Sequence, residues 1–283
     1  MKNAPNSKAN LDKAIDRFAG NPLRANEVRN LMANAIVAQL IGNGVVKGGT
    51  GLKFRYGEVM SRVTEDLDTA WKTNLDAFLK DLRARLSVGW NGFSGEIRIL
   101  RQGSPKDVPF EYVMQPCDVK LKYLGKPWYT VQLEIGHNEI GDADEYDEVE
   151  VPQVLKELFA FLALPCTGSV PAMRLEYQIA QKLHGASEEG SKRAHDLIDL
   201  QLIMNEADVD LGRTCDICQE LFRYRKKQEW PPRIVKGEKW EKVYEGQKGN
   251  LPVLHSVDEA IIWANDLIAK IDAQSDLSAA GGR

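Results

Sequence analysis

The chain has few cysteines, no long apolar run and no strong excess of either charge. Four cysteines in 283 residues exclude a disulfide scaffold, and the one CxxC pair, Cys215 and Cys218, has no second pair to complete a structural zinc site. Polar residues and glycines interrupt residues 31–46, the longest apolar-looking stretch, and residues 1–10 lack the apolar core of a signal peptide. We therefore expect reduced thiols, no membrane segment and a cytoplasmic location.

The overall charge is close to neutral. The chain has 37 lysines and arginines against 41 aspartates and glutamates, which gives a formal net charge of -4. This balance argues against a protein that coats DNA, but it permits a local basic groove. A hydrophobic content of 43% excludes a chain that is disordered from end to end, and the length allows one large domain or two smaller ones.

The apolar periodicity changes near the middle of the chain. Helical spacing over residues 26–40 and 74–86, with strand-like segments between residues 96 and 135, predicts a mixed α+β domain over residues 20–150. Beyond it the apolar residues follow a helical spacing. We therefore predict a helical C-terminal domain over residues 151–283.

Two acidic residues, Asp66 and Asp68, are candidates for binding a metal. We predict a strand here, in which residues i and i+2 point to the same face. Two adjacent carboxylates repel unless a cation lies between them, and Mg²⁺ is a hard ion that takes oxygen ligands. A DxD pair is common in proteins, so the spacing needs support from another motif.

A glycine pair, Gly48 and Gly49, precedes these carboxylates and is followed by Thr50. Glycines let the backbone approach a ligand closely, and the N–H groups at a helix start favour a phosphate. The alternative is an ordinary turn, with Thr50 capping the helix. Occurring together with Asp66 and Asp68, the glycines favour a phosphate site next to a metal site.

The helical half contains a lysine and two aspartates of interest. Lys182 has apolar neighbours on its predicted helix, and a partly buried lysine is costly unless it meets an anion. The alternative is a surface lysine whose ammonium reaches water. Asp196 and Asp199 share a helix face at a spacing of three, and Arg193 is placed to pair with Asp196 within the helix.

Two segments have an unusual charge. Residues 134–150 contain eight acidic residues and no lysine or arginine, which indicates a solvated loop more than a metal-binding tract. Glu134, at the end of a predicted strand, is a candidate third carboxylate or simply the first residue of that loop.

Residues 213–248 contain ten lysines and arginines against six acidic residues. The aromatic residues of this segment are Phe222, Tyr224, Trp230, Trp240 and Tyr244. The mixture suits single-stranded nucleic acid, through phosphate neutralisation and base stacking, or equally a solvated surface over packed aromatic rings.

These motifs resemble a known family. Residues 46–52, 56–57 and 62–68 together resemble the N-terminal signature of the AbiEii/MenT nucleotidyltransferase toxins, and residues 176–183 followed by 193–200 resemble the second signature. The resemblance implies a DNA polymerase β-like nucleotidyltransferase fold with a catalytic mixed-sheet domain and a helical C-terminal domain. It also implies Mg²⁺, or Mn²⁺ in its place, as cofactor and a nucleoside triphosphate as co-substrate.

The resemblance further implies roles for individual residues. For nucleotide binding, the candidates are Gly48, Gly49, Thr50, Lys53, Thr64, Lys182 and Asp199. For catalysis, the candidates are Asp66, Asp68, Lys182 and Asp196. The implied metal ligands are Asp66 and Asp68, to which we add Glu134 as the third carboxylate. His195 stands where relatives often have lysine or arginine, so one electrostatic contact differs.

Some members of this family add nucleotides to tRNA 3′ ends and so block aminoacylation. We therefore expect a Mg²⁺-dependent toxin that transfers nucleotides to an RNA acceptor, tRNA in particular, and a cognate antitoxin on a separate chain. Two alternatives stay open. The first is a nucleotidyltransferase that modifies a protein hydroxyl or a small molecule, and the second is a non-catalytic module that binds nucleotide or RNA.

Overall fold

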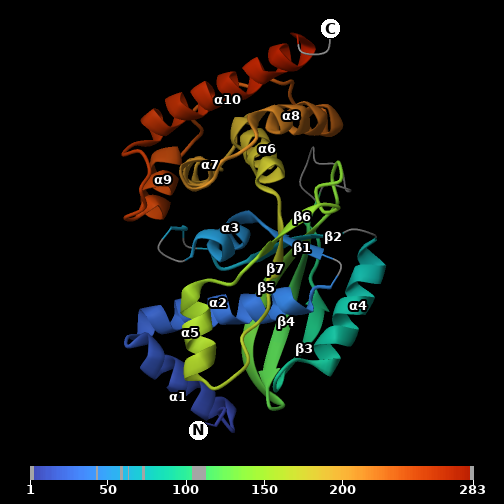
Figure 1. The fold of residues 1–283 in the computed structure, drawn as a ribbon, viewed down its shortest axis with the longest axis vertical. Helices are drawn as coiled ribbons and strands as arrows, with labels where there is room; N and C mark the ends of the chain where they lie inside the picture. Colours follow the sequence, from blue (N-terminus) through green and yellow to red (C-terminus); the bar gives the residue numbers. More distant parts are fainter. Residues whose placement is uncertain are drawn as a thin grey trace. The chain divides into compact units, whose positions relative to one another are not determined.

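The structure, a computed structural model, describes residues 3–42, 44–57, 60–62, 64–71, 74–103 and 113–280. The chain forms two compact units and passes between them more than once (Figure 1). The first unit is Met1–Gly57 with Thr64–Ala172, and the second is Glu58–Val63 with Met173–Arg283. A short segment in the N-terminal part of the chain therefore belongs to the second unit.

The described part of the first unit contains a seven-stranded mixed sheet in the order β3-β4-β5-β2-β1-β7-β6. The strands are β1 (Gly44–Lys47), β2 (Leu67–Trp71), β3 (Phe93–Ile99), β4 (Gln115–Tyr123), β5 (Lys126–Gly136), β6 (Tyr146–Val149) and β7 (Val170–Met173). β2 pairs in parallel with β5 and antiparallel with β1, and β1 pairs in parallel with β7. This last pairing keeps the chain in the first unit as far as Ala172, beyond the boundary at residue 150 that we predicted.

The helices of the first unit are α1 (Lys8–Ala19), α2 (Pro22–Leu40), α3 (Gly48–Tyr56), α4 (Leu75–Val88) and α5 (Gln153–Phe161). Three of them begin at a side-chain cap: Ser7, Asn21 and Asn74 each accept a hydrogen bond from the backbone N–H three residues later. The helices predicted over residues 26–40 and 74–86 are thus confirmed, as parts of α2 and α4.

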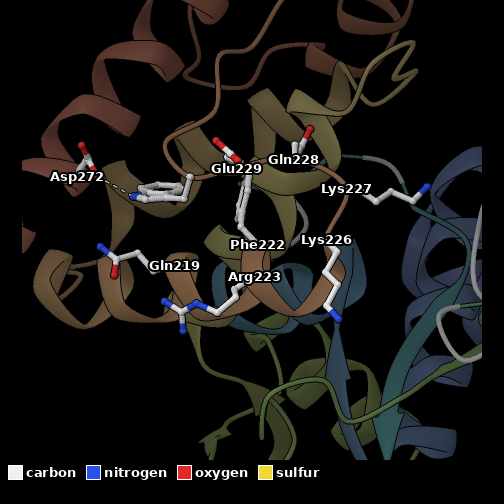
Figure 2. A pocket seen from close by; sticks show the side chains of 9 residues that line it. Gln219, Phe222, Arg223, Lys226, Lys227, Gln228, Glu229 and Asp272 are labelled. Carbon is white, nitrogen blue, oxygen red and sulfur yellow. Dashed lines mark hydrogen bonds between the residues drawn. The ribbon is translucent and has the colours of Figure 1, made fainter.

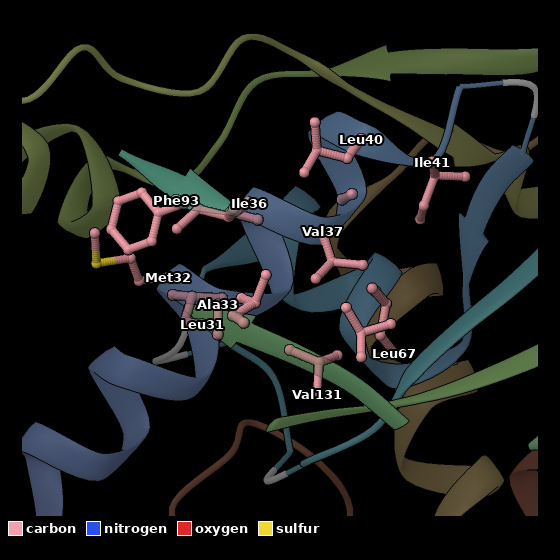
Figure 3. Close-up of a cluster of buried hydrophobic side chains, with 14 of the residues drawn as sticks. Leu31, Met32, Ala33, Ile36, Val37, Leu40, Ile41, Leu67, Phe93 and Val131 are labelled. Atoms are coloured by element: carbon pink, nitrogen blue, oxygen red, sulfur yellow. The ribbon is translucent and has the colours of Figure 1, made fainter. Parts of the chain in front are cut away.

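Helix α2 lies at the centre of the apolar core of the first unit. It is buried around most of its circumference, as expected for a helix enclosed by other elements. It packs against α1, α4, α5 and β5. Figure 3 shows Leu31 and Val37 of this helix near Leu67 of β2 and Val131 of β5. The core therefore supports the two strands that bear the candidate carboxylates.

The second unit is helical in its described residues. Its helices are α6 (Leu175–Ser187), α7 (His195–Glu206), α8 (Leu211–Arg225), α9 (Trp240–Lys248) and α10 (Val257–Ala280). Helix α8 packs on α6 and α10, while α7 packs on α6, α9 and α10. Trp240 and Tyr244 of α9 are fully buried, and the Tyr244 hydroxyl donates to the Leu254 carbonyl oxygen. These two rings belong to the core of the second unit and do not form a stacking surface.

A mixed sheet followed by helices confirms the predicted α+β class. The four cysteines are free, and Cys166 alone among them is exposed. Over the described residues, no helix combines the length and the apolar character needed to cross a membrane.

Candidate functional site

The glycine motif lies where β1 passes directly into α3. Gly48 is the first residue of the helix and has a φ of 64°, in the left-handed region that favours glycine. Thr50 is buried, and its Oγ1 donates a 2.6 Å hydrogen bond to the backbone oxygen of Asp66. The start of α3 is therefore fixed to the chain segment that leads into β2.

Asp66 is held from a second side. The Thr64 hydroxyl Oγ1 donates to Asp66 Oδ1 at 2.6 Å, and Lys53 Nζ donates to the Thr64 carbonyl oxygen at 3.4 Å. We predicted that a strand includes both aspartates, but β2 begins at Leu67. Asp66 instead precedes the strand, because its carbonyl oxygen accepts a hydrogen bond from the Thr50 hydroxyl and its carboxylate accepts one from the Thr64 hydroxyl.

The register of the sheet places a cation and two carboxylates in one row. Asp68 on β2 is the direct partner of Lys47 on β1 and of Glu134 on β5. Directly paired residues point to the same face of a sheet and have neighbouring Cβ atoms. Asp68 and Glu134 are both half-buried. The structure thus brings Glu134 beside Asp68.

Gly48 is in close contact with this row. A Cβ atom added to Gly48 would lie 2.1 Å from Asp68 Oδ2, so the carboxylate of Asp68 rests against the Cα of Gly48 at the start of α3. Negative groups are stabilised at a helix N-terminus. A side chain at position 48 is therefore excluded both by the backbone and by Asp68.

For the nucleotide transfer that the sequence resemblance implies, we expect Gly48→Ala to lower the rate by about 10²-fold, because a displacement of about 1 Å in a group at the reacting centre has an effect of that order. The measurement is the initial rate of label transfer by the purified protein. Gly125→Ala is the matched control: Gly125 also has a positive φ, 76°, but a Cβ there meets no atom within 4 Å. Equal rates in the two variants would mean that the contact with Asp68 is unimportant.

The carboxylates of the first unit suit a hard cation. Asp66, Asp68 and Glu134 offer oxygen donors only, as Mg²⁺ prefers. Within the described residues, no three carboxylate, imidazole or thiol side chains are close enough together to hold a metal ion. Mg²⁺ is usually bound by one or two carboxylates together with water and substrate phosphates, so a preformed trio is not required for it.

In the second unit, Lys182 is at the centre of a buried ionic network. Lys182 of α6 is 4% exposed, and its Nζ donates to Asp196 Oδ1 at 3.0 Å and to Asp199 Oδ2 at 2.6 Å. Both aspartates lie on α7 and are buried. The prediction that Lys182 is partly buried and needs an anion is confirmed, and two of its three donors are taken by protein carboxylates.

Two arginines complete this network. Arg62 Nε donates to Asp199 Oδ1 at 3.0 Å and to Oδ2 at 3.1 Å, and Arg193 Nε donates to Asp196 Oδ2. Burial alone would raise the pKa of Asp196, but the charges of Arg193 and Lys182 outweigh it and hold that pKa well below its usual range. The network therefore joins three cations and two carboxylates and has a net charge of +1.

His184 of α6 is buried in the same unit. It is 2% exposed, its Nδ1 lies 3.3 Å from Arg225 Nη1, and its Nε2 has no hydrogen-bond partner within the described structure. Burial, reinforced by the charges of Arg225 and Lys227, lowers the pKa of His184 to about 3. The imidazole is therefore neutral in the folded protein at neutral pH.

This burial predicts a loss of stability in mild acid. Between about pH 6.5 and pH 3 the unfolded histidine binds a proton that the folded one does not, so the free energy of unfolding falls by up to about 1.4 kcal/mol per pH unit as the pH decreases. Urea denaturation at several pH values measures the slope. His184→Gln removes the titrating group and should flatten it by that amount, whereas an unchanged slope would contradict the assignment.

The predicted residues thus fall into two groups, each contained within one unit. The first group is Gly48, Gly49, Thr50, Lys53, Thr64, Asp66, Asp68 and Glu134, and the second is Lys182, Asp196 and Asp199. Sequence reasoning missed Lys47, beside Asp68 in the sheet, and Arg62, on Asp199. Both residues lie within the segments that resemble the N-terminal signature, but only strand pairing places Lys47 beside Asp68, and only the fold of the second unit places Arg62 on Asp199.

Comparisons with known proteins agree with these motifs. The family described as "Nucleotidyl transferase AbiEii toxin, Type IV TA system" matches residues 30–266. Among solved structures, the chain is similar to MenT4, a nucleotidyltransferase toxin from Mycobacterium tuberculosis H37Rv, with 14% identity and a TM-score of 0.54 over 92% of this chain and 98% of that one. JHP933 from Helicobacter pylori is similar with 16% identity and a TM-score of 0.45, over 92% and 97%. A comparison with curated proteins gave no match.

The likeness to MenT4 supports the fold. At 14% identity it says nothing about substrates, but it covers nearly the whole of both chains. The family match also extends over most of this chain and includes the predicted residues of both groups. The predicted nucleotidyltransferase fold is therefore confirmed.

Proposed function

Because the chain belongs to the AbiEii family of nucleotidyltransferase toxins of type IV toxin–antitoxin systems, we propose that it transfers nucleotides from a nucleoside triphosphate to an RNA acceptor in a Mg²⁺-dependent reaction. The acceptor we propose is the 3′ end of tRNA in the cytoplasm, where the added nucleotides would block aminoacylation and hence translation. Membership of the family implies a nucleotide substrate and an antitoxin as partner.

The observation that most supports this proposal is the placement of the carboxylates in the first unit. Asp68 and Glu134 are direct partners on parallel strands, and Asp66 is held by the Thr64 hydroxyl just before β2. Two or three oxygen donors next to a glycine-containing helix start provide for a metal ion and a phosphate in one place. A structural role alone would not require carboxylates to be adjacent in a sheet, since they repel.

The proposed reaction is an in-line attack by an acceptor hydroxyl on the α-phosphorus, with pyrophosphate leaving, and the protein mainly positions groups and stabilises charge. Bound Mg²⁺ would neutralise phosphate oxygens and lower the pKa of the attacking hydroxyl. Asp66 and Asp68 are the ligands we propose, with Glu134 as the third. The Thr64 hydroxyl orients Asp66 by its hydrogen bond.

The remaining predicted residues would act on the nucleotide. The backbone at Gly49 and Thr50, at the start of α3, would bind its phosphates, and Lys53 would support Thr64 through the carbonyl oxygen that it contacts. Lys182 is the nucleotide-binding lysine that the resemblance implies, and Asp196 and Asp199 hold its ammonium in place.

The direct test incubates the protein with each labelled nucleoside triphosphate, total RNA and Mg²⁺. We expect label in small RNA from at least one nucleotide, and no label after removal of the divalent ion by a chelator. RNA sequencing of the labelled fraction identifies the acceptor. Label that enters protein and not RNA would support a protein hydroxyl as acceptor, and absence of label from all four nucleotides would support a non-catalytic binding module.

A further inference from the structure

The second unit contains a groove of about 730 Å³ at the C-terminal end of α8, entirely separate from the Lys182 network in its lining residues. Its wall is formed by the end of α8, the turn that follows it and one residue of α10, as Figure 2 shows. Three cations, Arg223, Lys226 and Lys227, lie on this wall together with the ring of Trp230. The groove thus coincides with the basic and aromatic segment of the sequence.

Some cations in residues 213–248 contact other side chains, and others do not. Arg225 lies against His184, and Lys227 donates to Glu188 at 2.8 Å. Arg223 and Lys226 are exposed, and within the described structure neither side chain makes a hydrogen bond or ion pair. The groove therefore presents two positive charges that no protein carboxylate neutralises.

Trp230, one of the two aromatic residues that line the groove, is held in a defined orientation. Trp230 is half-buried, its Nε1 donates to Asp272 Oδ1 at 2.8 Å, and its ring packs edge-on against the buried Phe222 at 5.3 Å between centroids. The carboxylate of Asp272 thus accepts a hydrogen bond from the indole. Of the two acidic residues in the lining, Glu229 is the one left exposed, so the free charges of the groove still favour an anion.

We propose that this groove binds the single-stranded part of the acceptor RNA, with Arg223 and Lys226 on its phosphates and Trp230 against a base. The proposal rests on the proposed function and names a binding surface for its acceptor. The helix dipole alone stabilises cations at a helix C-terminus, but it does not explain a fixed aromatic ring beside them. Neutralised phosphates combined with an aromatic stacking partner are the general basis of single-strand binding.

The test measures binding of a fluorescein-labelled single-stranded RNA of about 12 nucleotides by anisotropy, over about 50 to 200 mM salt, without nucleoside triphosphate. We expect the double variant Arg223→Ala/Lys226→Ala to weaken binding about tenfold and to reduce the slope of log affinity against log salt by about 1.4, because each phosphate contact contributes about 0.7. Trp230→Leu should weaken binding about tenfold with the slope unchanged, because stacking releases no counterion.

The matched control is Arg233→Ala/Lys242→Ala. These two cations are also exposed and unpaired in the described structure and belong to the same basic segment, but they lie outside the groove. The control should bind RNA as the unchanged protein does, and all variants are checked for an unchanged melting temperature. The proposal would be overturned if the control variant lost as much RNA affinity as the groove variant, or if the Arg223→Ala/Lys226→Ala variant bound RNA with full affinity. The second result would favour an acidic protein surface as the ligand of the groove.

Binding and transfer can fail separately. RNA binding that survives Asp66→Ala but is lost in the groove variant supports the groove, whatever the transfer assay gives. Absence of label transfer with intact, groove-dependent RNA binding would overturn the proposed function and leave the groove assignment standing. Normal transfer to RNA by the groove variant at low RNA concentration would overturn the groove assignment alone.

Discussion

Asp66→Ala is expected to lower nucleotide transfer by at least about 10³-fold. The variant removes a proposed metal ligand, and the charge that a metal neutralises in the transition state corresponds to several kcal/mol of barrier. The change also frees the Thr64 hydroxyl, which donates to Asp66 Oδ1, but the hydrogen bond from the Thr50 hydroxyl to the backbone carbonyl oxygen of residue 66 can remain. The fold should therefore survive, and growth inhibition on expression should disappear with the activity.

The measurement is the single-turnover rate with saturating nucleotide and RNA, together with a melting curve. Asp68→Asn should produce a comparable loss, because it keeps the shape of the side chain and removes the negative charge. Asp118→Asn is the matched control: Asp118 is a half-buried carboxylate of the same sheet, on β4, with no role in the proposed site. An active Asp66→Ala protein, or equal losses in all three variants, would remove the metal site from the proposal.

Strand pairing explains why some of this site could be predicted from the sequence and some could not. Asp66, Asp68 and the glycines before them are close together in the sequence, so the sequence alone reveals this motif. Whether Glu134 belonged to the site or to the acidic loop depended on the register of β2 against β5, which local pattern does not determine. The pairing of β1 with β2 likewise brings Lys47 beside Asp68, a contact that the motif does not indicate.

In the second unit, the sequence alone does not distinguish buried aromatic residues from exposed ones. Periodicity predicted a helical domain here, and the cost of burying a lysine correctly indicated that Lys182 must meet an anion. The composition of residues 213–248 could not separate core aromatic residues from surface ones, since a buried ring and a stacking ring look alike in sequence. Trp240 and Tyr244 fill the core of the second unit, and Trp230 lines a groove.

The domain boundary was misplaced for a related reason. The strand β7 is only four residues long, and a parallel partner such as β1 lies far from it in the chain. Short strands joined by long-range pairing leave little periodicity to detect. Likewise, the assignment of Glu58–Val63 to the second unit follows from contacts such as that of Arg62 with Asp199, 137 residues away.

Lys182→Met is expected to destabilise the second unit by about 3 kcal/mol or more, measured by urea denaturation at neutral pH. Removing one partner of a buried ionic network leaves the others uncompensated, at a cost of roughly 3–5 kcal/mol. The lower end applies here because Arg62 still contacts Asp199 and Arg193 still contacts Asp196. Lys192→Met is the matched control: Lys192 is exposed and unpaired in the described structure, so its loss should change stability by less than about 0.5 kcal/mol.

The pH dependence identifies the cause of that loss. In the unchanged protein the depressed pKa of Asp196 adds stability that is present above the unfolded pKa of about 3.9 and is lost as the pH falls further. Without Lys182 the buried carboxylate of Asp196 has a higher pKa, so its protonation in acid removes the uncompensated charge and reduces the destabilisation of the variant. The difference in free energy of unfolding between Lys182→Met and the unchanged protein should therefore become smaller as the pH decreases. A difference that stays constant from neutral pH into acid would instead mean that lost packing of the lysine side chain, and not uncompensated charge, destabilises the variant.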